Sequence, residues 1–173
     1  LEHPEISAIS FVGSTQIGEY VYQKGTSHNK RVAAFTGGKN HMVVMPDADL
    51  EAAANAFVSA GFGSASQRCM AVSLLLPVGV ETAEKLRELI ITKTKALKMG
   101  AYNDESADFG AVISSQSKQS VLKAIDQCIE DGAELLLDGR SYQHPEYKNG
   151  YYIGPTLLDH VTTDMDFYKQ EVF

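Results

Sequence analysis

Apolar positions at the start of the chain first form a short run and then repeat with a helical spacing. The run "ISAISFV" ends at a Gly-Ser turn and predicts a strand. The following "STQIGEYVYQKGTSHN" predicts a helix whose start Ser14 or Thr15 can cap and whose end Gly25 suits. A second strand is predicted at residues 31–35. Strand, helix and strand in succession form the unit of a parallel sheet.

The same order of elements follows the Gly37-Gly38 turn. A strand is predicted at residues 41–45, and the helix "DADLEAAANAFVSAGFGSASQ" opens at Asp47 or Asp49, with acids in its first turn. The apolar run "AVSLLLPVGV" predicts a strand that Pro77 ends. The next helix, "ETAEKLRELIITKTKALKMG", is amphipathic, with one apolar stripe that contains Leu86, Leu89, Ile90 and Leu97.

Towards the end of the chain the pattern predicts one more helix and two strands. The helix lies in "SSQSKQSVLKAIDQCIEDG", and the strands lie in "AELLLDG" and in "GYYIGPTLLDHV", which a proline interrupts. No repeat or low-complexity linker is visible. The fold class is therefore α/β, with a parallel sheet covered by helices.

Composition narrows the classes of function. The 173 residues are 44% hydrophobic and 21% charged, as in globular domains, and the net charge is −7. No run of lysine or arginine suggests nucleic-acid binding, and no apolar stretch approaches the roughly 18 residues of a membrane span. No signal peptide is visible. Because the chain begins without methionine and stops at "KQEVF", we expect it to be a fragment of a longer protein.

Two cysteines fit a reducing compartment better than a disulfide scaffold. Cys69 follows Arg68 among small residues, in "GSASQRCMAVS". A neighbouring cation stabilises a thiolate, but free cysteine is also among the most buried residue types. From these residues alone Cys69 is a nucleophile or a buried packing residue. Cys128 shares a helical stripe with Val121, Ile125 and Ile129, so we expect it in the core.

The turn "FVGSTQIG" is a second candidate site. Gly13 and Ser14 lie where a strand meets a helix, and free backbone N–H groups at a helix start suit a phosphate. An ordinary capped turn is the alternative, because the full G-x-G-x-x-G pattern is absent. Glu171 is a lone acid that can equally be a surface carboxylate. No histidine has metal-ligand spacing to another histidine or cysteine, so we expect no metal site.

An ordered set of motifs resembles the aldehyde dehydrogenase superfamily over essentially the whole chain. The motifs are "FVGSTQIG", "FTGGKN", "DADLEAA", "GSASQRCMA", "FGAVIS", "GYYIGPTLL" and "QEVF". The forms "SQRCMA" and "GGKNH" are most similar to the branch that oxidises methylmalonate or malonate semialdehyde and acylates coenzyme A. The resemblance implies NAD as cofactor, a small semialdehyde substrate, a homo-oligomer and no nucleic-acid or membrane partner. It also implies a place in valine or inositol catabolism.

The resemblance assigns roles to five residues. Cys69 matches the catalytic nucleophile, and Arg68 matches an arginine that binds the substrate carboxylate, as bidentate arginine can. Gly13 and Ser14 match the turn that meets the NAD pyrophosphate. Glu171 matches the glutamate that holds the nicotinamide ribose.

One departure from the family pattern bears on the product. Hydrolytic members carry Glu in E-L-G-G, where this chain has Phe35 before Thr36-Gly37-Gly38. Phenylalanine cannot activate water, so we expect the acyl group on Cys69 to pass to coenzyme A, giving acetyl-CoA or propionyl-CoA. An ordinary aldehyde dehydrogenase that releases an acid, and a non-catalytic truncated module, remain the alternatives.

The resemblance also predicts the domain organisation. Residues 1–36 should be the C-terminal part of the NAD-binding domain, and residues 37–173 a catalytic domain that is incomplete at its C-terminus. We expect the 173-residue chain to fold, to be inactive alone, and to associate into dimers or larger species through open sheet edges. The compartment implied is the bacterial cytoplasm or the mitochondrial matrix.

Overall fold

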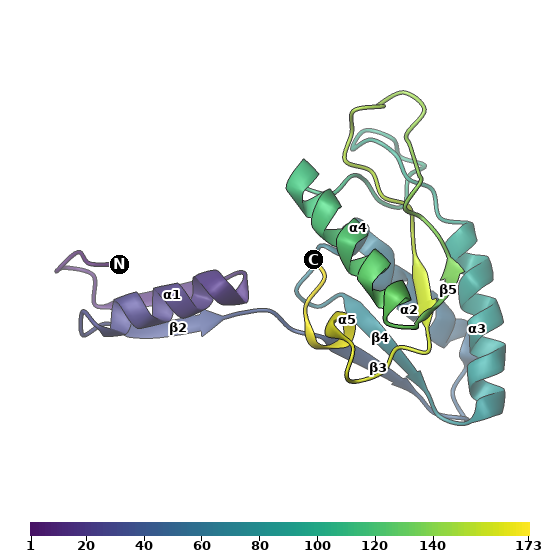
Figure 1. Ribbon diagram of the computed structural model, residues 1–173, viewed down its shortest axis with the longest axis horizontal. Helices are drawn as coiled ribbons and strands as arrows, with labels where there is room; N and C mark the ends of the chain where they lie inside the picture. The colour runs from purple at the N-terminus through teal and green to yellow at the C-terminus, as the bar shows by residue number, and fades with distance from the viewer. The chain divides into compact units, whose positions relative to one another are not determined.

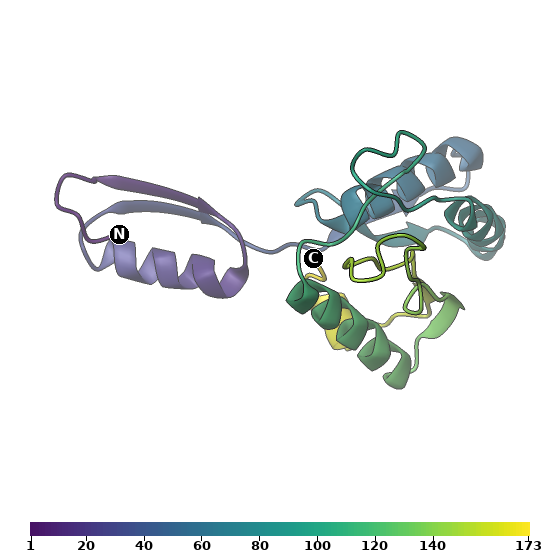
Figure 2. The same cartoon turned by 90° about the horizontal axis from the view of Figure 1, so that it is seen from above.

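The computed structural model describes residues 1–173, which divide into two compact units, Leu1–Gly38 and Lys39–Phe173. The first unit contains the predicted strand, helix and strand: β1 (Ala8–Val12), α1 (Thr15–Thr26) and β2 (Arg31–Phe35). The two strands pair in parallel, with Ala8 opposite Arg31 and Val12 opposite Phe35. Helix α1 covers one face of this pair (Figure 2), and the other face carries exposed side chains.

Gly25 does not end the first helix, contrary to the sequence prediction. Helix α1 continues past it, and the left-handed residue that follows the helix is Asn29, with φ of 60°. Gly25 is buried instead, and a Cβ atom there would lie 2.6 Å from Cγ2 of Val32. The glycine therefore allows helix and strand to approach closely.

The second unit begins with another parallel β-α-β arrangement, followed by a long helix (Figure 1). Its elements are β3 (Asn40–Val44), α2 (Leu50–Phe62), β4 (Val72–Pro77) and α3 (Val80–Lys95). Of the two predicted caps, Asp49 begins α2, because its carboxylate accepts a hydrogen bond from the Ala52 N–H at 3.0 Å. The β3–β4 ladder is irregular between Asn40 and His41, where β4 has one extra residue.

The main core lies where α2 and α3 pack on the β3–β4 pair. Its buried members are Val44, Ala54, Phe57, Val58, Leu86 and Ile90. Leu89, predicted on the same stripe, is partly buried against it, and so is Leu97, although α3 ends two residues before it. The helical spacing of apolar residues therefore identified the buried face of α3 correctly.

The rest of the second unit differs from the uniformly parallel arrangement that we expected. It consists of α4 (Ser115–Glu130), β5 (Glu134–Leu137), β6 (Leu157–Asp159) and the short α5 (Asp166–Lys169). Strands β5 and β6 pair in antiparallel fashion, and only three residues of the second predicted strand join the ladder. Helix α5 was not predicted. No helix has the combination of length and apolar character that crossing a bilayer demands.

Candidate functional site

Cys69 lies in a tight turn that leads into β4. The Ala71 N–H closes this turn by donating to the Arg68 carbonyl at 3.0 Å, and the cysteine side chain is exposed. Cys128 is fully buried on α4, as its helical spacing predicted, and burial raises the pKa of its thiol. The two thiols thus lie in opposite environments, and only Cys69 is accessible to a reactant.

A left-handed turn precedes the Cys69 turn. Ser64, Ala65 and Ser66 have φ of 55°, 52° and 62°, values that side chains with a Cβ atom disfavour. Hydrogen bonds hold this conformation: the Ser66 hydroxyl donates to the Gly61 carbonyl, and the Gln67 N–H donates to the Ser64 carbonyl at 3.0 Å. Backbone strain of this kind persists only where surrounding contacts impose it, and it is frequent beside functional residues.

Arg68 folds back over the left-handed turn. Its Nε donates to the Ser64 hydroxyl at 3.1 Å, and its guanidinium lies so close to Gly63 that a Cβ atom there would be 2.6 Å from Nη1. The arginine is exposed and makes no ion pair with an acidic residue of the chain. An unpaired guanidinium beside an exposed thiol can bind a carboxylate on a small molecule.

Asn40, the first residue of β3, holds the Cys69 turn from a neighbouring strand. Its Nδ2 donates to the carbonyls of Cys69 and Ala71, both at 2.9 Å. On the other side of the turn, the Gln67 side-chain carbonyl accepts from the Ile113 N–H at 3.0 Å. The turn is therefore fixed to two distant segments, by the side chain of Asn40 and by the backbone of Ile113.

Lys39 contacts the segment that leads into Glu171. Its Nζ donates to the Gln170 carbonyl at 2.9 Å and to the Phe167 carbonyl at 2.5 Å. The ammonium also lies 4.7 Å from the centre of the Phe167 ring. Burial lowers the pKa of Lys39. Glu171 itself is exposed, in the extended segment after α5.

Gly13 and Ser14 lie in the first unit, between β1 and α1. Ser14 is the N-terminal capping residue by position, but its hydroxyl caps no backbone N–H, and the first turn contains no acidic residue. The Gly13 N–H donates to the Phe35 carbonyl at 3.1 Å, which fixes the turn to β2. The free N–H groups at the start of this helix of 12 residues can bind an anionic group by donating hydrogen bonds to it.

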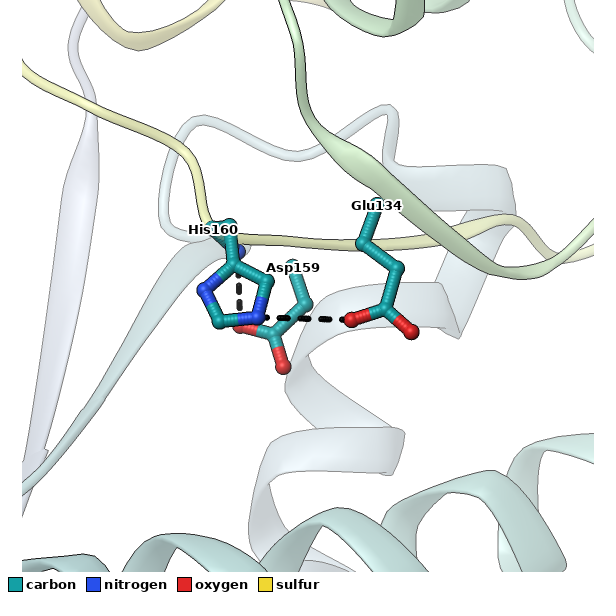
Figure 3. A group of neighbouring side chains, drawn as sticks. All are labelled: Glu134, Asp159 and His160. Carbon is teal, nitrogen blue, oxygen red and sulfur yellow. Dashed lines mark hydrogen bonds and ion pairs between the residues drawn. The ribbon is translucent and has the colours of Figure 1, made fainter.

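A cluster of Glu134, Asp159 and His160 joins β5 and β6, and their potential ligand atoms lie within 4.8 Å of one another (Figure 3). His160 Nε2 lies 3.4 Å from Glu134. Arg87 of α3 already pairs with both carboxylates, at 2.7 Å and 3.6 Å. Because the guanidinium compensates their charge, we interpret the cluster as an ion-pair network that ties α3 to the β5–β6 hairpin.

Sequence reasoning missed the contacts made by Lys39 and Asn40. The stretch "GGKNH" indicated a turn before a strand, and no local signal links it to residues about 30 and 130 positions away. The left-handed turn was missed as well, because Ser64, Ala65 and Ser66 include no glycine.

Comparisons with known proteins agree over the whole chain. The model of the aldehyde dehydrogenase family matches residues 1–173. A malonate-semialdehyde dehydrogenase of Pseudomonas aeruginosa is 45% identical over 173 residues, all of this chain and 35% of the relative. The acylating mitochondrial methylmalonate-semialdehyde/malonate-semialdehyde dehydrogenase of Bos taurus is 46% identical over 172 residues, 99% of this chain and 32% of the relative.

A solved structure agrees equally well. It is a crystal structure of a protein from Sinorhizobium meliloti in complex with NAD, described as a methylmalonate-semialdehyde dehydrogenase by similarity. It superposes with a TM-score of 0.96 at 49% identity, over 99% of this chain and 35% of that one. The chain therefore spans about a third of the length of the relatives that it matches.

Proposed function

Because this chain belongs to the aldehyde dehydrogenase family, we propose that the protein carrying it oxidises malonate or methylmalonate semialdehyde with NAD and passes the acyl group to coenzyme A. The match to semialdehyde dehydrogenases along the whole chain, at 45% and 46% identity, carries this proposal. The activity is proposed for the complete protein, since the chain spans only a third of its relatives.

Cys69 is the proposed nucleophile. Its thiolate adds to the aldehyde carbon and forms a carbon–sulfur bond, while the carbonyl electrons move onto oxygen. The Cys69 backbone N–H stabilises that oxyanion. Loss of hydride from the same carbon then leaves a thioester on Cys69. Exposure of this thiol, in contrast to the buried Cys128, supports the assignment.

Arg68 is the proposed anchor for the substrate carboxylate. Malonate and methylmalonate semialdehyde each carry a carboxylate near the aldehyde, and a planar guanidinium binds such a group through two parallel hydrogen bonds. The absence of an acidic partner for Arg68 supports this role, because the side chain keeps its charge for a ligand. Its bond to Ser64 fixes the Nε side of the guanidinium beside the cysteine turn.

Gly13, Ser14 and Glu171 are the proposed NAD ligands. The unfilled cap of α1 and the lack of acids in its first turn fit the pyrophosphate, and the exposed Glu171 carboxylate fits the ribose hydroxyls. When bound, NAD supplies the hydride acceptor. We accordingly assign residues 1–36 to the NAD-binding domain and residues 37–173 to the catalytic domain of a homo-oligomeric enzyme of the bacterial cytoplasm or mitochondrial matrix.

Coenzyme A is the proposed acyl acceptor. Phe35 stands where hydrolytic members have the glutamate that activates water, and its apolar ring cannot take a proton. Coenzyme A, as its thiolate, adds to the thioester carbonyl and displaces Cys69 as thiolate. The carboxylate then leaves as carbon dioxide, and the carbon that carried it takes up a proton from water. The products are acetyl-CoA from the malonate substrate and propionyl-CoA from the methylmalonate substrate.

The decisive test measures NADH formation from malonate semialdehyde by the complete protein, with and without coenzyme A. We expect turnover only when coenzyme A is present, and none in Cys69→Ala. Cys128→Ala is the control, because it removes the second thiol of these 173 residues and should keep the activity. Equal turnover without coenzyme A would assign the protein to the hydrolytic class instead.

A further inference from the structure

We infer that three consecutive residues, Lys39–His41, position the two segments of the second unit that carry the proposed chemistry. Asn40 contacts the Cys69 turn, and its two neighbours contact the segment that leads into Glu171. This inference deepens the proposed function and rests on it. It concerns positioning residues, because none of the three is proposed to touch the reacting atoms.

Asn40 acts through the backbone of the nucleophile. Both hydrogens of its amide are used, one on the Cys69 carbonyl and one on the Ala71 carbonyl. No hydrogen bond of the chain fixes the exposed Cys69 side chain, so its position follows from the backbone of the turn. A displacement of about 1 Å in a reacting group costs roughly a hundredfold in rate. The two hydrogen bonds of Asn40, called the Asn40 clamp, therefore have a direct kinetic consequence.

Lys39 and His41 act on the other segment. The Gln170 carbonyl that Lys39 binds belongs to the peptide unit that ends at the Glu171 nitrogen. His41 Nδ1 lies 2.8 Å from the Lys39 carbonyl, which only accepts, so Nδ1 carries a proton. In the neutral ring Nε2 then accepts from the Tyr168 hydroxyl at 3.2 Å.

The division of contacts follows from backbone geometry. Successive side chains of an extended chain point to opposite faces. Lys39 and His41 both reach the α5 segment, and Asn40, which lies between them, reaches the Cys69 turn instead. One short extended stretch therefore fixes both segments.

The test compares two variants of the complete protein that each remove one set of contacts. Asn40→Leu keeps the size of the side chain but lacks both donors, and Lys39→Met keeps the length but lacks the ammonium. Two quantities separate the variants: the rate of Cys69 alkylation by iodoacetamide, resolved by peptide mass spectrometry, and the Kd for NAD. The kcat for NADH formation is measured beside them. Buried Cys128 is the reference in every sample, because an unfolded variant would label it.

We expect the two variants to change different quantities. Asn40→Leu should change the Cys69 alkylation rate and lower kcat by roughly ten- to a hundredfold, with the Kd for NAD changed less than about twofold. Lys39→Met should raise the Kd for NAD by about tenfold and leave Cys69 alkylation nearly unchanged. Lys39→Arg, which keeps a cationic donor, should restore most of the affinity.

Parallel changes in both quantities, or no change in either, would overturn the inference, since a purely structural role would not separate them. If iodoacetamide labels Cys128 in the Asn40→Leu variant, that variant is unfolded. The milder Asn40→Ser, which keeps one hydrogen-bond donor, then replaces it in the comparison. A wild-type protein that forms no NADH would overturn the proposed function. The alkylation rates would still decide whether Asn40 positions Cys69.

Discussion

Thr94 is a fully buried residue of α3 whose hydroxyl has no hydrogen-bond partner. A buried polar group without a partner loses its hydration with no compensation. Thr94→Val keeps the branched shape and removes that group. We expect the free energy of unfolding to rise by about 1 kcal/mol, measured by urea titration. Thr92→Val, at an exposed position of the same helix, is the control for helix propensity.

Asp138 gives a prediction about pH. Hydrogen bonds from the Arg140 side chain and backbone lower its pKa to about 2, from 3.8. Because the folded pKa lies below the unfolded one, the stabilisation is complete above pH of about 4 and is lost as the pH falls towards 2. Carboxyl NMR titration should find this pKa, and Arg140→Gln should return it towards 3.8. An unchanged pKa in that variant would contradict the assignment, and Arg87→Gln is the control.

At the scale of elements, α4 ends in a motif that depends on one glycine. The Ala133 N–H donates to the Cys128 carbonyl and the Gly132 N–H to the Ile129 carbonyl, both at 3.0 Å, and Gly132 has φ of 108°. These are the two hydrogen bonds of a Schellman motif. The glycine is needed for its backbone angle alone, because a Cβ atom there would meet open space.

Gly132→Ala should therefore destabilise the second unit by about 1 kcal/mol, through backbone strain and without a steric clash. Urea unfolding measures the loss. Gly110→Ala is a matched control, since its added Cβ would make only an ordinary contact, 3.5 Å from the Gly100 carbonyl, and its φ is not in the left-handed region. Equal effects of the two substitutions would rule out the backbone explanation.

The elements that could be predicted from sequence are those with a long apolar pattern. The two parallel strand pairs and helices α1 to α4 each contain such a pattern, often with a cap such as Asp49. Helix α5 has four residues, too few for a period to be visible, and the antiparallel pairing of β5 with β6 depends on tertiary packing. The exposure of Cys69 could not be predicted from its neighbours in the sequence or from its spacing to apolar residues. The clamp by Asn40 is a long-range contact between polar side chain and backbone, which no local pattern encodes.

At the scale of the whole molecule, each unit has a sheet face with exposed apolar side chains. Two cross-strand pairs lie there: Val12 opposite Phe35, exposed by 65% and 63%, and Val43 opposite Leu76, exposed by 59% and 43%. Apolar side chains on a sheet with open edges favour association. The net charge of −7 opposes association only at short range, since salt screens the repulsion at distances beyond about a Debye length.

We therefore expect the 173-residue chain to associate as its concentration rises, and Val43→Lys with Leu76→Lys to weaken that association. Light scattering across a dilution series measures it. Thr92→Lys with Ala96→Lys adds the same charge at exposed positions of α3 and its C-terminus, and should change association less. A chain that stays monomeric at high concentration would contradict the prediction.

The alternation of contacts along Lys39–His41 also constrains how the gene can vary. A codon inserted before this stretch leaves the order of the three side chains intact. A codon inserted between Lys39 and Asn40 reverses the faces for every later residue of β3, and two of the three contacts are lost together. A substitution at one position can weaken a hydrogen bond by degrees, because one donor can be replaced by a weaker one. An inserted residue removes the contact entirely. Insertions and deletions within Lys39–His41 should therefore be tolerated less well than substitutions.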